Sequence, residues 1–289
     1  MTGALDAWFT DVRRGVAHAI PRAGAFARHA VVVASTGSTN DDVARAAREG
    51  APEGYTVIAA AQTAGRGRRG TSFYSPPAAG IYLSTLLRPD HWESVQGDSS
   101  SPAAALVTLM AGVAVAGAVT HACDAPIALK WPNDVITQQR PWRKLAGILA
   151  EGATEGRALR TIVVGIGLNL RRTAAPDDVA HRMIALDEVI GAETTAQQVE
   201  RLVAGLLTGL HEGCDMLARG DCAAVRAQWR SLAPSVDGTR VRWHDQGVAH
   251  TGRSAGIDER GALRVRIDGG GDLIVHGGDL EWLTDGESA

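Results

Sequence analysis

The stretch Gln62-Thr63-Ala64-Gly65-Arg66-Gly67-Arg68-Arg69-Gly70-Thr71-Ser72-Phe73 decides between two folds for this 289-residue chain. Gly65, Gly67 and Gly70 match the G-x-G-x-x-G pattern of dinucleotide-binding domains, and an apolar, strand-like segment precedes them. That pattern requires a helix that begins inside the motif, whereas this chain continues through two prolines to another strand-like segment at 81–87. The sequence therefore argues against a dinucleotide-binding domain and for a different kind of loop.

Three arginines alternate with the glycines of this loop, a composition that suits an anion site. Backbone N–H groups and guanidinium groups can converge on carboxylate or phosphate oxygens. The alternative is an exposed Arg-Gly-Gly-like turn that binds RNA weakly or binds nothing, but RNA-binding segments of this kind are repeated and lie in basic chains. This segment occurs once, and 29 Lys and Arg are set against 32 Asp and Glu, a formal charge of −3. We expect a local anion site and no nucleic-acid partner.

Three further clusters place polar residues beside strand-like segments. Lys130-Trp131-Pro132-Asn133-Asp134 ends one segment, Lys144 opens another that runs to Glu151, and Asn169 follows the glycines of Gly165-Ile166-Gly167-Leu168-Asn169. Glycines in a strand allow close approach to the backbone. Each cluster is weak evidence alone, because Lys144, for example, also suits a lysine whose stem lies along a sheet edge.

The remaining pattern predicts a chain of mixed helices and strands. Short apolar segments predict strands at 29–34, 55–62, 81–87, 127–131, 145–151 and 160–170. Helical patterns lie at 38–48, where Ser38 and Thr39 offer capping hydroxyls, and at 103–122 and 197–229. After Pro234, strands at 240–243, 248–255, 263–267 and 272–276 predict a small β-barrel. Segments 91–101 and 137–143 read as solvent-exposed excursions.

The composition argues against several classes of protein and site. The uncharged stretch 103–120 is mostly Ala, Gly and Val after a Ser-Pro helix start, which favours a buried core helix over a membrane span. Cys123, Cys214 and Cys222 form no CxxC pair, and no secretory signal is visible, so a reducing cytoplasm fits best. The cluster 211–215 is a weak metal candidate that a helix explains without a ligand.

Taken in order after Gly37-Ser38-Thr39-Asn40, these clusters resemble the motifs of the biotin protein ligases, also called biotin-[acetyl-CoA-carboxylase] ligases, over about residues 31–285. The resemblance implies an α+β fold, in which a biotin/lipoate ligase-like catalytic domain at 31–233 has a mixed β-sheet with flanking helices. A small C-terminal SH3-like β-barrel is expected at 234–289, and residues 1–30 are expected to be a helical lead-in. The resemblance is to the short form, because 30 residues are too few for an N-terminal DNA-binding domain.

The resemblance also implies a two-step reaction. Biotin and ATP with Mg²⁺ give biotinyl-5′-AMP and pyrophosphate, and a lysine of a biotin carboxyl carrier domain then takes the biotinyl group. The carrier belongs to acetyl-CoA carboxylase or another biotin-dependent enzyme. A lipoate or octanoate ligase or transferase of the same fold is the nearest alternative, and a non-enzymatic biotin-binding module is another. The expected protein is cytoplasmic, with no membrane partner, and is a monomer or a homodimer.

By the same resemblance, Lys144 and Arg68 are the catalytic residues. Their charges would offset the repulsion between two anions about 4 Å apart, which is several kcal/mol at an effective dielectric near ~20. The predicted biotin-binding residues are Ser38, Thr39, Asn40, Gln62, Gly65, Arg66, Gly67, Arg68, Lys144 and Gly147. The predicted ATP and adenylate contacts are Arg66, Arg68, Phe73, Asn133, Lys144 and Asn169.

Three points of the implied site are less direct. Phe73 stands where the family commonly has Trp, which leaves a smaller ring face for adenine. Lys130 and Asp134 are assigned to positioning the acceptor lysine or a magnesium ion, and no dedicated protein metal site is expected. The loop at 65–70 is expected to become ordered over the adenylate and exclude water from it.

Overall fold

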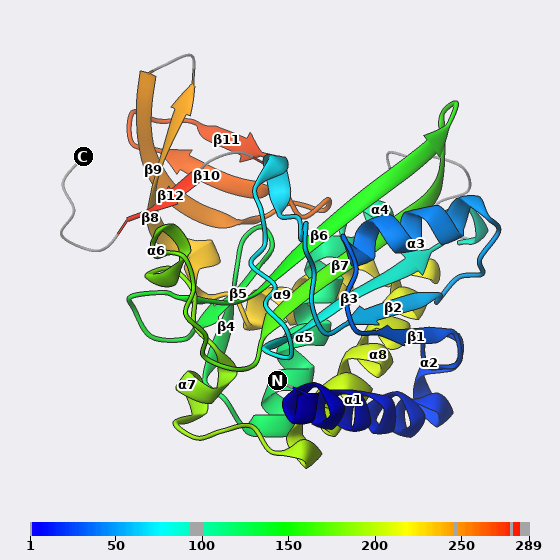
Figure 1. The fold of residues 1–289 in the computed structure, drawn as a ribbon. Coiled ribbons are helices and arrows are strands. Elements are labelled where there is room, and N and C mark those ends of the chain that lie inside the picture. The colour runs from blue at the N-terminus through cyan, green and yellow to red at the C-terminus, as the bar shows by residue number, and fades with distance from the viewer. Residues whose placement is uncertain (1, 93–100, 246–247, 278–279, 284–289) are drawn as a thin grey trace.

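A seven-stranded mixed sheet forms the centre of the computed structural model, which describes residues 2–92, 101–245, 248–277 and 280–283 (Figure 1). Its strand order is β1-β2-β3-β7-β6-β5-β4; β1 pairs parallel with β2, and the other neighbours pair antiparallel. The strands are β1 (Ala30–Val33), β2 (Thr56–Ala59), β3 (Gly80–Leu87), β4 (Ile127–Lys130), β5 (Asp134–Thr137), β6 (Lys144–Glu155) and β7 (Ala158–Asn169). The mixed sheet expected from the sequence is confirmed, although β5 was missed because its first residues read as a turn.

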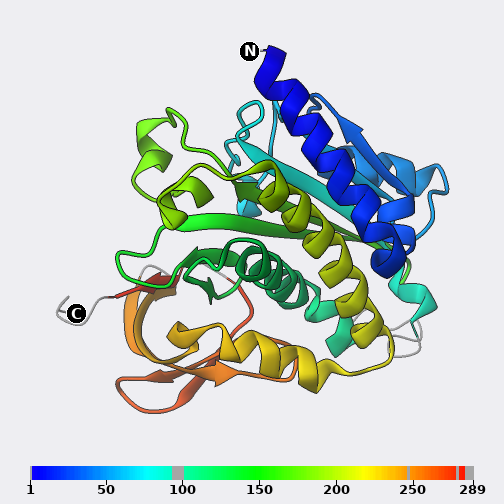
Figure 2. The same ribbon diagram turned by 90° about the horizontal axis from the view of Figure 1, so that it is seen from below.

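Helices cover the two faces of this sheet unequally. Helices α1 (Thr2–Ala23), α5 (Val107–Cys123) and α8 (Ala196–Ala218) share one large apolar core with the sheet (Figures 1 and 2). On the other face, α3 (Thr39–Arg48) buries Val43 in a small cluster with Val57, Leu86 and Val163. Because α3 spans only part of that face, the portion of β6 and β7 beside its N-terminus is left uncovered.

Helix α5 is the uncharged stretch that could have been taken for a membrane span. It lies inside the protein, with residues such as Leu109, Val115 and Val119 at most 3% exposed. Just before it, Ser101 accepts a hydrogen bond from the N–H of Ala103 at the start of α4 (Pro102–Ala105), as its Ser-Pro sequence predicts. Among the described residues, no helix combines the length and apolar character needed to cross a membrane.

The helical pattern expected at 197–229 is two helices, α8 and α9 (Cys222–Ser231). The break follows from Gly220, whose φ of 84° is in the left-handed region that ends helices. The remaining short helices are α2 (Ala25–Arg28), α6 (Asp177–Ala180), α7 (Leu186–Ile190) and the 3₁₀ turns η1 (Arg68–Gly70), η2 (Pro89–His91) and η3 (Pro234–Val236).

A separate five-stranded antiparallel sheet follows η3, with the strand order β11-β10-β9-β8-β12. Its strands are β8 (Asp237–Asp245), β9 (Val248–Ile257), β10 (Leu263–Ile267), β11 (Asp272–Val275) and β12 (Leu280–Trp282). Four of these strands were expected and β12 was not, because three residues carry no readable alternation. The small β unit is therefore confirmed, while its SH3-like character and the domain limits at 30, 233 and 289 stay predictions.

The two predicted excursions have different outcomes. Residues 93–100 of the first lie outside the described residues. In the second, Gln138 to Pro141 are exposed, but Arg140 Nη1 donates to the carbonyl of Leu283 at 2.9 Å and the rings of Trp142 and Trp282 meet edge to face. This segment therefore connects the seven-stranded sheet to the C-terminal sheet.

Trp131 also connects the two sheets, and it should be important for stability. Its side chain is 3% exposed, and its Nε1 donates to the carbonyl of Gly261 at 2.9 Å. We expect Trp131→Ala to lower the free energy of unfolding by about 3–5 kcal/mol, as for other buried tryptophans. Trp131→Phe keeps most of the packing but leaves that carbonyl unpaired, which should cost about 1–3 kcal/mol. Urea denaturation measures both, and equal losses for the two variants would contradict a separate hydrogen-bond contribution.

Candidate active site

The floor of the candidate site is glycine backbone on β6 and β7. Alternate residues of a strand face opposite sides of its sheet, so Gly165 and Gly167 lie on the same face as Val163, which contacts α3. Their neighbours Val164, Ile166 and Leu168 face the large core. Gly147 of β6 pairs with Gly167. Three adjacent positions beside the N-terminus of α3 therefore carry no side chain on this face of the sheet.

The start of α3 borders this floor with buried polar groups. Gln62 Oε1 accepts hydrogen bonds from the N–H and the hydroxyl of Thr39 at 2.9 and 3.1 Å. Ser84 Oγ lies 2.7 Å from Thr39 Oγ1 and 2.6 Å from Asn40 Oδ1. Ser38 occupies the N-cap position, but its side chain accepts no capping hydrogen bond, so the capping expected of its hydroxyl is wrong. Gln62, from a distant segment, satisfies the first N–H of the helix instead.

The loop at residues 65–70, called the arginine loop below, forms one side of the site. A Cβ on Gly65 would lie 2.6 Å from the carbonyl oxygen of Phe73, so this position needs glycine; one on Gly67 would lie 2.5 Å from Thr71 Oγ1, which would have to move. Arg66 Nη2 is 2.7 Å from Asp41 Oδ1 and 2.8 Å from Glu151 Oε2. The loop is therefore tied to α3 and to β6 through one guanidinium group.

The turn between β4 and β5 and the first residue of β6 form the opposite side of the site. Lys144 Nζ lies 2.6 Å from Asp134 Oδ1. Asn133 donates from Nδ2 to the carbonyl of Ile148 at 2.9 Å, and its Oδ1 accepts from Arg68 Nη1 at 3.3 Å. Burial lowers the pKa of Lys130, while Asp134 acts in the opposite direction. The cationic groups of two distant segments thus converge above the glycine floor.

The Phe73 ring fills most of the space over that floor. A Cβ on Gly167 would lie 2.3 Å from a Phe73 ring carbon, and one on Gly147 would lie 3.3 Å from another. The Lys144 ammonium is 6.0 Å from the ring centroid. The remaining cavity has a volume of only about 30 Å³. A ligand can occupy the floor only if the Phe73 ring moves away from it.

A second cavity of about 260 Å³ adjoins the first and shares Asn133, Ile148 and Leu149 with it. Arg68 lines it from the arginine loop, and Arg260 and His276 line it from the C-terminal sheet. The two cavities meet at Asn133, which accepts a hydrogen bond from Arg68. A ligand in the first cavity could therefore place a reacting group close to a ligand in the second.

The structure brings most of the predicted residues together. The first cavity is lined by Ser38, Thr39, Asn40, Gln62, Arg66, Gly67, Phe73, Asn133, Lys144 and Gly147. Gly65, Arg68, Lys130, Asp134 and Asn169 are not part of that lining. Asn169, placed on the ATP side by the sequence, is 6% exposed and donates to the carbonyl of Ile184 at 3.2 Å and to that of Lys144 at 3.4 Å. Its amide thus fixes the main chain at Lys144.

Several residues of the site were missed by sequence reasoning. Asp41, Ser84 and Glu151 bind predicted residues, while Arg260 and His276 line the second cavity. The glycines at 165 and 167 did predict the floor, because glycine at alternate positions leaves one face of a strand without side chains. Ser84 and Glu151 had no comparable signal, since their partners lie 44 and 111 positions away in the chain.

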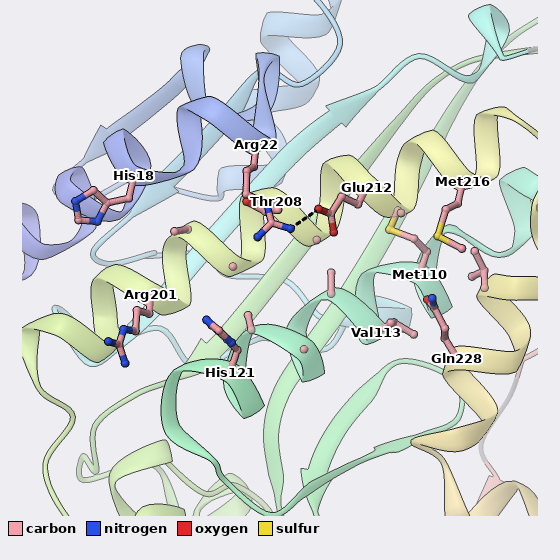
Figure 3. Close-up of a pocket in the computed structure, with 18 residues that line it drawn as sticks. His18, Arg22, Met110, Val113, His121, Arg201, Thr208, Glu212, Met216 and Gln228 are labelled. Carbon is pink, nitrogen blue, oxygen red and sulfur yellow. Dashed lines mark hydrogen bonds and ion pairs between the residues drawn. The ribbon is translucent and has the colours of Figure 1, made fainter.

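Two other features of the chain were considered as sites: the cluster at 211–215 and a cavity between helices. Within the described residues, no group of three or more His, Cys, Asp or Glu side chains could hold a metal ion, and His211 lies 3.8 Å from Asp215 as part of one helix. A larger cavity of about 460 Å³ lies between α1, α5, α8 and α9, where Arg22 pairs with Glu212 (Figure 3). It contains none of the predicted site residues.

Comparisons with known proteins show which family the chain resembles. The family model described as the biotin/lipoate A/B protein ligase family matches residues 32–169. A biotin--[acetyl-CoA-carboxylase] ligase of Mycobacterium tuberculosis is 35% identical over 266 residues, 90% of this chain and 91% of that protein. A bifunctional ligase/repressor of Bacillus spizizenii is 30% identical, over 83% of this chain and 69% of its own length.

Solved structures show the same fold. A biotin protein ligase from Aquifex aeolicus in complex with biotin and ATP superposes with a TM-score of 0.70 and 23% identity, covering 88% of this chain and 99% of that one. The family match coincides with the segments that build the first cavity, from α3 to the end of β7. By these similarities the chain belongs to the biotin/lipoate A/B protein ligase family.

Proposed function

We propose that this protein is an ATP-dependent biotin-[biotin carboxyl carrier protein] ligase. In the first step a biotin carboxylate oxygen attacks the α-phosphorus of ATP, and pyrophosphate leaves. In the second step the neutral amine of an acceptor lysine attacks the carbonyl carbon of biotinyl-5′-AMP; AMP leaves and the nitrogen loses a proton. The product is an amide bond on the carrier.

One observation carries this proposal: cations from two distant segments line the two adjoining cavities. Lys144 and Arg66 line the first cavity, and Arg68 lines the second. The carboxylate and the α-phosphate are both anions, so they approach only where positive charge offsets their repulsion. The same charges would stabilise the phosphoryl oxygens in the transition state, because their positions are fixed before the reaction. The arrangement thus suits acyl adenylation.

The polar end of the first cavity favours biotin over an alkyl acid. Thr39, Asn40 and Gln62 line this cavity with hydroxyl and amide groups; Thr39 is hydrogen-bonded to Gln62 directly and to Asn40 through Ser84. A ureido head can hydrogen-bond to such groups, whereas an octanoyl chain offers them no donor or acceptor and gains nothing from this end of the cavity. A lipoate or octanoate ligase is therefore the second candidate, since the family includes both.

We assign the adjoining cavity to ATP. Arg68, Arg260 and His276 would bind the phosphates, with Asn133 at the junction; Phe73 could then stack on adenine once its ring leaves the glycine floor. When bound, Mg²⁺ would neutralise part of the phosphate charge. The carboxylate beside the junction, Asp134, is already paired with Lys144, so we expect the ion to arrive with ATP. Lys130 and Asp134 are proposed to position the acceptor lysine.

The proposed partner is the biotin carboxyl carrier domain of acetyl-CoA carboxylase or another biotin-dependent enzyme. We propose no nucleic-acid or membrane partner, and a monomer or a homodimer. A cytoplasmic location agrees with three free cysteines, of which Cys214 is buried, with a thiol pKa that burial raises.

Biotin-dependent exchange of labelled pyrophosphate into ATP tests the proposal. We expect exchange with biotin and none above background with octanoate, because only biotin can hydrogen-bond to the polar end of the cavity. Transfer of labelled biotin to a carrier domain then tests the second step. Exchange with octanoate but not with biotin would contradict the proposal and support the lipoate branch. If neither acid supports exchange, the protein is not an acyl-adenylating enzyme, and a non-enzymatic biotin-binding protein is the remaining alternative.

A further inference from the structure

The cavity of about 460 Å³ lies among the helices on the face of the sheet away from the candidate active site (Figure 3). Its floor is the seam between α5 and α8, where glycines of α8 meet alanines of α5. A Cβ on Gly205 would lie 3.1 Å from Ala118 Cβ, and one on Gly209 would lie 3.1 Å from Ala114 Cβ. Residues of α1 and α9 form the walls. The small residues along the seam thus leave open space between these two helices.

Positive charge exceeds negative charge around this cavity. Among the described residues that line it, Glu212 is the one carboxylate, and it pairs with Arg22 at 2.7 Å (Figure 3). Arg201 and His121 also line the cavity, and neither has a hydrogen-bond or ion-pair partner in the described part of the chain. The guanidinium group of Arg201 is permanently charged. The end of the cavity at Arg201 and His121, its cationic end, therefore offers an anion a charge that no described carboxylate neutralises.

The opposite end of the cavity is mostly apolar. Met110, Val113 and Met216 line it, with Gln228 at its border, and Figure 3 shows these side chains away from the cationic end. Methionine side chains are unbranched and flexible, so they can adapt to an apolar chain that lies against them. The cavity is thus amphipathic along its length, which suits a ligand with an anionic head and an apolar chain.

Thr208 lines the cavity with a hydroxyl group that has no partner. The residue is only 9% exposed, yet the described residues offer its Oγ1 atom no hydrogen bond. A threonine inside a helix commonly bonds to the carbonyl four residues before it, as Thr10 of α1 does with Asp6 at 3.0 Å. Thr208 does not make this bond. Because buried polar groups are nearly always paired, its hydroxyl points to an acceptor that a ligand supplies.

We propose that this cavity binds a carboxylic acid with an unbranched apolar chain. The carboxylate accepts a hydrogen bond from Thr208 Oγ1, with Arg22 held one helical turn away through its pair with Glu212. The chain runs over the seam towards Met216, which lies about 12 Å further along the helix, the length of roughly ten carbons. Arg201 adds positive charge at the cationic end.

The size and the position of the cavity agree with a separate small-molecule site. Its volume is within the range of about 300–1,000 Å³ that such sites have. None of the residues that line it also lines either cavity of the candidate active site. The proposal is therefore independent of the proposed function.

Calorimetry with decanoate, in the absence and in the presence of saturating biotin, tests the site. We expect saturable binding of one decanoate per chain, unchanged by biotin. Decylamine, whose head is a cation, should not bind measurably, and hexanoate should bind at least about tenfold more weakly because it buries fewer methylene groups. Displacement of decanoate by biotin would place the acid in the first cavity and overturn the proposal. Absence of saturable binding, or equal binding of decylamine, would overturn it as well.

Thr208→Val tests the head-group contact. Valine keeps the shape of the side chain, and the hydroxyl has no partner to lose, so the variant should melt at the wild-type temperature. We expect it to bind decanoate about tenfold more weakly, because a hydrogen bond to a charged group is lost. The control is Thr120→Val on α5, an exposed residue outside the lining, which should keep the wild-type affinity.

Arg201→Gln tests the charge. We expect the affinity for decanoate to fall about fivefold, because the unpaired cation of the cavity is removed. The control is Arg219→Gln at the other end of the same helix, whose side chain is 63% exposed and lies 3.7 Å from Asp221. Unchanged affinity in either Thr208→Val or Arg201→Gln, or an equal loss in its control, would overturn the proposal.

Discussion

Lys144→Ala is expected to reduce biotin-dependent pyrophosphate exchange by at least about 100-fold, the loss typical of removing one charge-stabilising donor from an active site. Lys144 is placed for this role by its position at the first residue of β6, where it lines the first cavity. Its ammonium lies 2.6 Å from Asp134 and 6.0 Å from the Phe73 ring centroid. Without it, the carboxylate and the α-phosphate would approach beside an uncompensated Asp134.

Two further variants separate charge from packing. Lys144→Met keeps the methylene stem, which passes within 2.7 Å of where a Gly147 Cβ would lie, and should be as inactive as the alanine variant. Lys144→Arg keeps the charge and should retain more exchange than either. Melting temperatures show whether loss of the Asp134 partner has unfolded the protein. Full exchange by a folded Lys144→Met variant would exclude Lys144 as the essential cation.

The central sheet could be predicted from the sequence because its strands are apolar segments with clear ends. Their pairing could not: β3 lies beside β7, more than 70 residues later, and only the folded chain shows that Ser84 faces Gly165. Short strands were missed for a different reason. β5 begins at Asp134, where the preceding Pro-Asn pair reads as a turn, and β12 contains three residues, too few for an alternating pattern.

The residues of the site also fall into those that the sequence predicted and those that it did not. Residues within the quoted motifs, such as Thr39, Arg66 and Lys144, meet at one cavity because those motifs lie at strand and helix ends around one patch of sheet. Their partners Asp41, Ser84 and Glu151 are ordinary polar residues whose role depends on contacts made in the fold. Asn169 illustrates the limit, since a strand-end amide suits a ligand and a main-chain carbonyl equally well.

Gly165→Ala is expected to weaken biotin binding by at least about 100-fold, the scale on which a displacement of about 1 Å affects an active site. The added methyl would lie 2.2 Å from Asn40 Oδ1 and 3.0 Å from Asn40 Cγ. A side chain can move more easily than a strand, so the protein should fold and Asn40 should leave its place between Ser84 and Glu151. Calorimetry with biotin measures the loss.

Gly117→Ala is the matched control, because a Cβ at this helical position meets no atom within 4 Å. It should bind biotin like the wild type and be slightly more stable, since alanine favours helix over glycine. Biotin affinity that survives Gly165→Ala would show that Asn40 does not hold the polar head. The preference for biotin over an alkyl acid would then lose its structural basis, because Asn40 is a buried amide to which a ureido head can hydrogen-bond and an octanoyl chain cannot. The two members of the family would have to be distinguished by pyrophosphate exchange alone.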